Sequence, residues 1–493
     1  MITRRDLLKG AAGAGLVSAL GCGSVAPRDG SIAEENRKQG TTDWLLSKSR
    51  ATKCRSPWIE GYCSRTSVRA GESIEIKVST NPPSPFVIDL YRMGYYGGRG
   101  GRFAGQLGPF KGSVQDDPPE GEERARECRW ETATKITIPN DWPSGVYLGK
   151  MTAEKEGLQS YVIFVVRDDR PCDFLFQVSD TTWAAYNRWP DLWSLYDDGT
   201  PPNNWYVGPG VRASFDRPYG KYRQILDAPL SQGSGEFLLW EFPLAFWMER
   251  EGYDVSYISN LDTHAEPARL LRATSFLSIA HDEYWSLDMY RNAKAAIDAG
   301  VHAAFFSGNA VDGVIEVRPS AAGVPDRTIG RIGQFGFGDP RVKRLQAKWK
   351  QHGPDPALLM GVRTTIPANG GADWTCVNER HWLFDGTGLR NGESIKGLVG
   401  WEHHGLPADI AGLEVLARGP VTSNGRSQKV DYASTIFPAP KGNLVFNAAT
   451  IWWSDGLSEP PGYLRPTSHG NTPPGPDARV QRITQNLFRR FLA

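Results

Sequence analysis

The chain has 493 residues, and its 56 Lys and Arg against 55 Asp and Glu give a formal net charge of +1. This balance, without a block of like charges, argues against a nucleic-acid-binding protein, which normally carries a basic face or stripe. The length exceeds what one hydrophobic core normally serves, so we expect at least two domains. A hydrophobic share of 40% with 17 Trp excludes a disordered chain.

Residues 1–22 have the pattern of a targeting segment. Arg4 and Arg5 precede an apolar run over 10–21, which resembles a twin-arginine export signal. The run is too short to cross a bilayer core of roughly 30 Å as a helix. The residues before Cys22 also resemble a lipoprotein cleavage box, which leaves lipid attachment at Cys22 as an open alternative. We expect an exported protein, periplasmic or extracellular, that is soluble or tethered to the membrane by that lipid.

The next segments predict a linker and then an all-β domain. Residues 23–54 are polar, as in a linker. Over 55–170, apolar and polar residues alternate with the period of a half-buried strand, and turn residues separate the alternating segments. Such spacing is typical of an immunoglobulin-like β-sandwich. The expected strands are 73–78, 86–91, 134–138, 146–151 and 161–166.

From residue 171 to 493 the pattern predicts an α/β domain with a mostly parallel sheet. The strand expected over 173–178 is almost continuously apolar, as in a sheet covered on both faces. Strand, helix and strand then alternate at the lengths of βαβ units. The later expected strands are 254–259, 275–280, 301–307, 398–400 and 444–446, and the expected helices are 243–251, 286–299 and 480–491. Residues 318–378 and 458–477 are expected to be long loops.

The cysteines agree with export but do not fix a pairing. Beyond Cys22 there are five, so at least one thiol stays unpaired within a monomer. Bridges between Cys54 and Cys63, and between Cys128 and Cys172, are both open from the spacing.

Polar clusters follow the expected parallel strands, where ligands bind in open α/β sheets. Tyr186 lies in the cluster after 173–178, His281 and Glu283 follow 275–280, Asn309 follows 301–307, and Glu402 follows 398–400. We expect all four strand ends to meet at one edge. An imidazole with carboxylates is suited to metal ligation or to general acid–base chemistry.

Each of these residues also has a purely structural interpretation. His281 and Glu283 could cap the following helix, Asn309 could be a turn residue, and Glu402 could belong to an exposed turn. Tyr186 and Tyr219 could be buried aromatics with satisfied hydroxyls. Serine-hydrolase and nucleotide-binding motifs are absent, so the sequence argues against a serine hydrolase and against a nucleotide-binding protein.

Five motifs together resemble the catalytic domain of the N,N-dimethylformamidase large (beta) subunit family over about 172–493. They are 185–187, 217–219, the HDEYWS run at 281–286, 305–309 and 445–453. The resemblance implies a class I glutamine-amidotransferase-like α/β fold without that fold's cysteine nucleophile. It further implies a mononuclear iron held by two tyrosines and one glutamate, and hydrolysis of a small amide.

Carried over by motif, the resemblance assigns metal ligation to Tyr186, Tyr219 and Glu283, with Tyr196 competing with Tyr219 as the second tyrosine. His281 and Asn309 would either support the metal ligands from behind or polarise the substrate, and Glu402 would be the candidate general base. The implied partners are a small amide substrate and either a second copy of the chain or a small subunit.

Two functions from different classes follow. The first is an exported, metal-dependent hydrolase of an amide C–N bond, in which a bound cation polarises the carbonyl and activates water. The second is a non-catalytic exported protein that binds a polysaccharide or cell-wall component. Its support is a group of tryptophans that could stack on sugar rings, Trp183, Trp189, Trp193 and Trp205.

Overall fold

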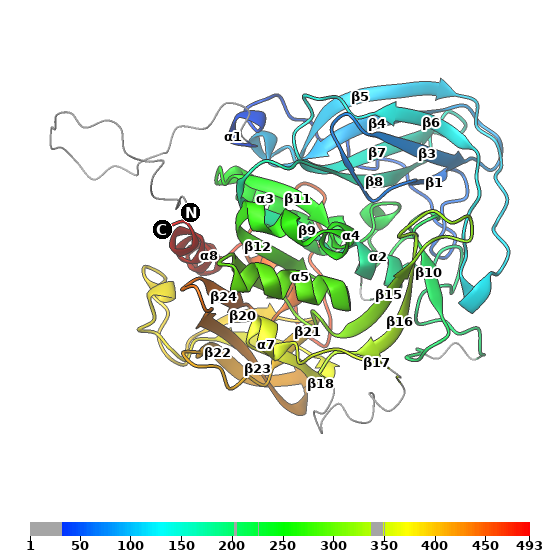
Figure 1. The fold of residues 1–493 in the computed structure, drawn as a ribbon. Coiled ribbons are helices and arrows are strands. Elements are labelled where there is room, and N and C mark those ends of the chain that lie inside the picture. The colour runs from blue at the N-terminus through cyan, green and yellow to red at the C-terminus, as the bar shows by residue number, and fades with distance from the viewer. Residues whose placement is uncertain (1–31, 202–204, 225, 337–348, 350) are drawn as a thin grey trace, which may run out of the picture.

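The computed structural model describes residues 32–201, 205–224, 226–336, 349 and 351–493, and it is a mixed α/β protein with several sheets (Figure 1). The expected export signal, Cys22 and residues 23–31 of the expected linker lie outside these residues. Within the described part of the chain, no helix is long and apolar enough to cross a membrane. The mixed α/β class is therefore confirmed, whereas the immunoglobulin-like and glutamine-amidotransferase-like assignments stay predictions.

Two sheets pack face to face in the first part of the chain. The five-stranded sheet has the order β2 (Ser67–Arg69), β8 (Gln159–Arg167), β7 (Gly145–Ala153), β4 (Phe86–Met93) and β5 (Gly101–Phe110). The three-stranded sheet has the order β1 (Glu60–Cys63), β3 (Ser73–Ser79) and β6 (Thr132–Thr137). Apolar residues of both sheets form one cluster, as expected for a sandwich.

Burial shows that this sandwich is not an isolated unit. Strand β3 alternates between buried and half-buried positions, as a strand with one covered face does. Strand β8 is buried at every position, so both faces of its sheet are covered. Tyr161 and Val165 face the same apolar cluster as Phe174 and Phe176 of the following domain, so the two parts share a core.

A seven-stranded sheet forms the centre of the molecule. Its order is β11 (Val255–Ser259), β9 (Cys172–Val178), β12 (Ala273–Ala280), β14 (His302–Ser307), β24 (Leu444–Asn447), β23 (Arg426–Pro438) and β22 (Glu414–Ser423). The first five strands are parallel, and the last two pair antiparallel. The expected mostly parallel sheet is present, with an antiparallel edge that the sequence did not predict.

Helices cover both faces of this sheet, which explains why its parallel strands are so apolar. Helix α5 (Leu287–Asp298) packs with Leu175 and Phe276 on one face. Helices α3 (Phe242–Arg250) and α8 (Ala478–Phe491) pack on the other with Phe174 and Leu277, the neighbouring positions of the same strands. Ser286 accepts a hydrogen bond from the Met289 amide and so begins α5 as predicted.

Smaller sheets and helices complete the α/β part. A third sheet contains β10 (Arg212–Ser214), β16 (Thr328–Gln334), β15 (Gly313–Arg318) and β13 (Tyr284–Ser286), with β17 (Gln351–His352) beside β16. Two-stranded sheets join β18 (Arg363–Asn369) to β21 (Glu402–Gly405) and β19 (Ala372–Thr375) to β20 (Ser394–Val399). The remaining α-helices are α1 (Ile32–Glu35), α2 (Asp180–Tyr186), α4 (Asn260–Ala265) and α7 (Ala357–Met360).

Short 3₁₀-helices and one π-helix connect these elements. The 3₁₀-helices are Tyr96–Gly98, Glu122–Arg124, Pro229–Ser231, Pro267–Arg272, Trp382–Phe384 and Ile451–Gly456, and the π-helix is Phe237–Glu241. The prediction of one long loop over 318–378 is wrong, because parts of that segment form strands that wall the site described below.

A buried ion pair joins the sandwich to the central sheet's helices. Arg92 of β4 lies 2.9 Å from Glu249 of α3, and both side chains are fully buried. Tyr257 and Asn36 also donate hydrogen bonds to Glu249, and Ser144 accepts two from Arg92. Such complete pairing is what a buried charge pair requires.

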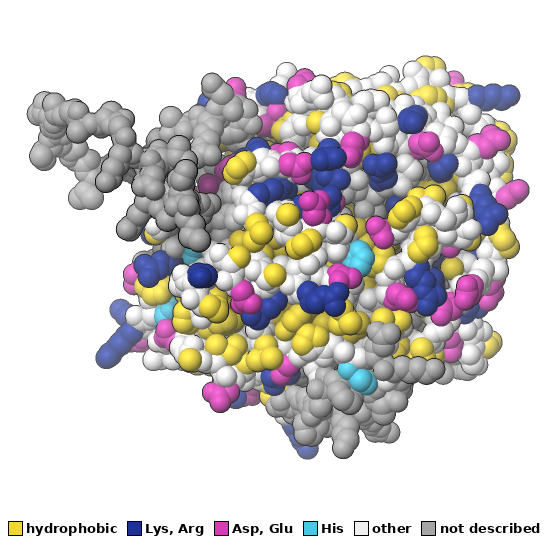
Figure 2. Space-filling view, viewed as in Figure 1, with side chains coloured by type: hydrophobic (Ala, Val, Ile, Leu, Met, Phe, Trp, Pro, Cys, Tyr) yellow, Lys and Arg dark blue, Asp and Glu magenta, His cyan; other side chains and the backbone are white. Residues whose placement is uncertain are grey.

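Neither disulfide left open by the cysteine spacing forms. Cys54, Cys63, Cys128, Cys172 and Cys376 are all buried free thiols. Cys54 instead directs its thiol to the carbonyl of Pro190 at 3.6 Å. On the molecular face of Figure 2, acidic and basic side chains are intermixed, with no large field of one sign.

Candidate active site

Three of the predicted site segments follow neighbouring parallel strands and meet at one edge of the central sheet. Tyr186 ends the helix after β9, Glu283 follows β12 and Asn309 follows β14. Glu402 reaches the same place by another route, because it begins β21 and pairs with Asn369 of β18. The expectation that its preceding strand lies in the central sheet is therefore wrong, since β20 pairs with β19.

A close backbone approach brings Glu402 against the end of β14. A Cβ atom on Gly308 would lie 2.2 Å from the Glu402 carbonyl oxygen, so only glycine fits here. The next residue, Asn309, has a left-handed φ of 59°, a conformation that asparagine tolerates better than most residues. Asn309 therefore lies in a turn, and its side chain lowers the pKa of the neighbouring Glu402.

Phenolic hydroxyls surround the buried carboxylate of Glu283. Tyr186 donates to Glu283 Oε2 at 2.5 Å, and the Tyr196 hydroxyl lies 3.0 Å from Glu283 Oε1 and 2.9 Å from the Tyr186 hydroxyl. Tyr284 donates to the Tyr196 hydroxyl at 2.6 Å. The hard oxygen atoms of three phenols and one carboxylate are therefore linked in one hydrogen-bonded group. All four side chains are buried, at most 5% exposed.

The structure places Tyr219 apart from this cluster. Its ring packs edge-on against Trp183 with centroids 6.1 Å apart. Besides burial, the charges that shift the pKa of its hydroxyl come from Asp180, Arg327 and Arg217 rather than from Glu283. Tyr196, the competing residue in the sequence, occupies the position beside Glu283 instead.

His281 lies between three carboxylates. Its Nδ1 atom is 2.8 Å from Glu236 Oε2, and its Nε2 atom is 3.4 Å from Glu283 Oε2 and 3.3 Å from Glu402 Oε2. Asn369 donates to the other oxygen of Glu402 at 3.0 Å. The imidazole is 1% exposed, so these neighbours decide its charge.

The pKa shifts follow from burial and from this grouping. Burial alone would lower the pKa of His281, but Glu236, Glu283 and Glu402 together raise it well above its usual value. Burial would likewise raise the pKa of Glu283, yet His281, Arg331 and Tyr186 hold it below its usual value. Burial raises the pKa of Glu402, and the nearby Glu283 charge adds to that rise.

The phenols are held in their protonated forms. Burial, followed by the charge of Glu283, raises the pKa of both Tyr186 and Tyr196 well above 10.0. Deprotonation of either hydroxyl therefore needs a compensating positive charge at this place.

Two orphaned polar atoms indicate that the site fits a cation or a polar ligand. His281 Nε2 and Glu402 Oε2 are buried and form an ion pair at 3.3 Å, but neither atom has the geometry of a hydrogen bond with any described residue. One ligand atom each from His281, Glu283 and Glu402 lies within 4.8 Å of the others, so this group could hold a metal ion. Buried orphaned polar atoms are costly unless a ligand, ion or water completes them.

Four contributors to the site were missed in the sequence. Tyr284 stands within the HDEYWS run and could have been noticed there. The other three follow no motif. Glu236 reaches the site from the start of the π-helix, Asn369 from β18 and Arg331 from β16. No sequence pattern connects them, because only the fold brings these segments together.

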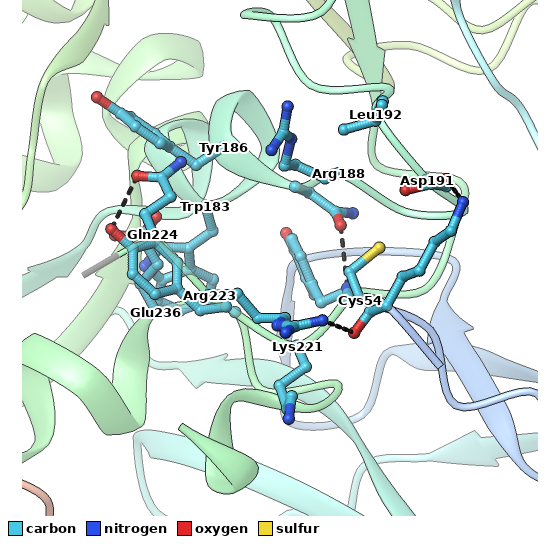
Figure 3. A pocket seen from close by; sticks show the side chains of 16 residues that line it. Cys54, Trp183, Tyr186, Arg188, Asp191, Leu192, Lys221, Arg223, Gln224 and Glu236 are labelled. Carbon is cyan, nitrogen blue, oxygen red and sulfur yellow. Dashed lines mark hydrogen bonds and ion pairs between the residues drawn. The ribbon is translucent and has the colours of Figure 1, made fainter. Parts of the chain in front are cut away.

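A pocket of about 300 Å³ lies beside the site. Figure 3 shows Tyr186, Gln224 and Glu236 on one side of the pocket, and Cys54 and Asp191 on the opposite side. Tyr186 contacts Glu283, and Glu236 contacts His281. The pocket therefore lies next to the group of carboxylates and phenols and shares Tyr186 and Glu236 with it.

The fold and the site define a mixed α/β protein with a buried His–Glu–Glu cluster that could hold a metal ion. The family model for the N,N-dimethylformamidase beta subunit-like C-terminal domain matches residues 87–468. The chain belongs to this family, which confirms the resemblance found in the sequence. The match begins within β4, so it includes most of the sandwich and not only the α/β part. No curated protein matches the chain.

Proposed function

We propose that the protein is a metal-dependent hydrolase that cleaves the C–N bond of an amide. The observation that carries this proposal is the convergence of Tyr186, Tyr196 and Glu283 beside His281 and Glu402 in one buried site. The family description names an amidase subunit and supports the same chemistry.

We infer that the metal is iron, held by Glu283, Tyr186 and Tyr196, so that Tyr196 replaces Tyr219 in the expected set. Carboxylate and phenolate oxygens are hard ligands, which suit ferric iron better than softer metals. A bound cation supplies Lewis-acid polarisation of the carbonyl and lowers the pKa of water.

The protein's own residues then move the protons. Glu402 accepts a proton from the attacking water as the new C–O bond forms, and later donates it to the leaving amine as the C–N bond breaks. His281 holds a proton at Nε2, where it can stabilise negative charge on the carbonyl oxygen. Asn309 lies beside Glu402 and helps to keep it ionised, because it lowers that pKa.

Spectroscopy on two matched tyrosine variants tests the ligand set. Phenolate bound to ferric iron gives a visible charge-transfer band, so we expect coloured protein that releases an amine from small amides. Tyr196→Phe should weaken or shift the band, while Tyr219→Phe should leave it in place. Iron affinity should rise with pH, since binding must displace protons from phenols whose pKa is above 10.0.

The opposite result for the two variants would restore Tyr219 as the ligand. Tightly bound zinc without any phenolate band would favour His281, Glu283 and Glu402 as the ligands. If reconstituted protein binds no metal and hydrolyses no amide, the hydrolase proposal fails.

The polysaccharide-binding alternative receives little support from the tryptophans. Trp183 and Trp189 are 4% and 0% exposed, so they cannot offer a ring face to a sugar. The guanidinium groups of Arg124 and Arg126 lie over the Trp193 ring, within 4.0 Å of its centroid. Trp205 is 49% exposed, but one face stacks on Tyr196 at the site.

We also propose that the protein is exported through Arg4 and Arg5, which suits a chain that folds and acquires its metal before translocation. Replacing both arginines by Lys should leave the precursor inside the cell, as cell fractionation would show. Normal export of the double variant would refute this.

As partner we infer a small subunit or a second copy of the chain, since the family description names a beta subunit. The mass of the assembly in solution distinguishes these two partners.

A further inference from the structure

The pocket in front of the site has a lining that differs from that of the metal cluster. It is about 300 Å³ in volume, at the lower end of ligand pockets in proteins, so it fits a small molecule. Trp183, Tyr186 and Tyr222 supply its aromatic wall. An inference about its ligand rests on the proposed function, because the ligand is then the amide substrate.

Basic side chains predominate around the pocket. Lys53, Arg188, Lys221 and Arg223 line it, whereas its carboxylates are Asp191 and Glu236. Asp191 is paired with Lys53, and Glu236 with His281. The other three cations among the described lining residues, Arg188, Lys221 and Arg223, pair with acids outside the lining.

Two of the lining cations share a single outside acid. Arg188 is paired with Asp197. Lys221 and Arg223 share the single carboxylate of Asp227, at 2.7 Å and 3.9 Å respectively. Asp227 is 65% exposed and Arg223 is 55% exposed, so a ligand at the mouth can compete for Arg223.

An orphaned hydrogen-bond donor lies in the same pocket. The Tyr222 hydroxyl donates to Gln224 Oε1 at 3.0 Å, so that end of the side-chain amide already has a partner. Gln224 Nε2 is buried and has no hydrogen-bond partner among the described residues. A buried donor of this kind is costly unless a ligand accepts from it.

We propose that the natural substrate is a small amide that carries a carboxylate, with the carboxylate bound by Arg223 and Gln224. A carboxylate only accepts hydrogen bonds, and it forms strong charge-assisted bonds with guanidinium groups. Its amide group then extends past the aromatic wall toward Glu236, Tyr186 and the site behind them. The cations at the mouth also attract an anionic substrate from solution.

Binding of two non-hydrolysable probes tests the proposal without relying on catalysis. The probes are 4-oxopentanoate, which carries a ketone in place of an amide and a free carboxylate, and 5-methylhexan-2-one, in which an uncharged isopropyl group replaces the carboxylate. Calorimetry on the full purified chain should show the anion binding about tenfold more tightly or better, as expected for charge-assisted bonds. In Arg223→Gln and Gln224→Leu, this preference should largely disappear.

Arg418→Gln is the matched control, since Arg418 is 53% exposed and paired with an exposed acid outside this pocket. It should keep the full preference for the anion. Equal affinity for the two probes, or a preference that survives in both pocket variants, overturns the proposal.

Hydrolysis of N-acetylglycine by the metal-loaded protein separates this inference from the proposed function. Selective anion binding without release of glycine or of any amine from neutral amides would refute the hydrolase and leave the anion pocket standing. Hydrolysis of neutral amides together with equal binding of the two probes would refute the pocket and leave the hydrolase standing.

Discussion

Glu283→Gln should release the metal and lower amide hydrolysis at least about a thousandfold, because Lewis-acid catalysis contributes several kcal/mol and each 1.4 kcal/mol is about a factor of ten. Glutamine has the same shape but lacks the negative charge that the cation needs. Tyr186 and Tyr196 would also lose the anionic acceptor that positions their hydroxyls. Elemental analysis and amine release measure the two losses.

The fold should survive this substitution. The Glu283 backbone carbonyl accepts bonds from Asp312 and Gly313, and these do not depend on the side chain. Circular dichroism should therefore be unchanged. Glu316→Gln is a matched control, since Glu316 is a 39% exposed glutamate paired with Arg318 away from the cluster. Full metal content in Glu283→Gln would show that Glu283 is not a ligand.

Local pattern predicts the elements better than the sheets they join. The strand over 275–280 and the helix after Ser286 follow from apolar periodicity and one cap, and they lie within a residue or two of β12 and α5. The antiparallel edge formed by β23 and β22 was missed. Strand pairing across long separations is not encoded in local periodicity, so it appears only in the fold.

The same contrast between local pattern and long-range contact holds for the candidate active site. His281 and Glu283 directly follow a predicted strand, and the rule for strand ends therefore finds them. Glu236 contacts His281 across 45 positions of the chain, from a π-helix that no motif marks. The distinction between Tyr196 and Tyr219 also required the fold, because both stand in loops whose course the sequence does not specify.

Glu402→Gln should reduce turnover by a factor of about 10² to 10⁴, the usual contribution of a general base, while the metal content stays normal. Glutamine can still accept the hydrogen bond that Asn369 donates to Oε1, so the side chain should keep its position. The substitution removes the ability to take a proton from water, together with one of the three carboxylate charges that face His281. Rates and elemental analysis on the same preparation measure both properties.

The pH profile gives a second, independent readout of Glu402. Burial raises its pKa above 4.5, and only the ionised form can accept a proton. As pH falls through this raised value, the wild-type rate should fall, at a higher pH than for an exposed glutamate. The residual rate of Glu402→Gln should lack that acid limb. Loss of metal from this variant would instead place Glu402, with His281 and Glu283, among the ligands, because their ligand atoms lie within 4.8 Å of one another.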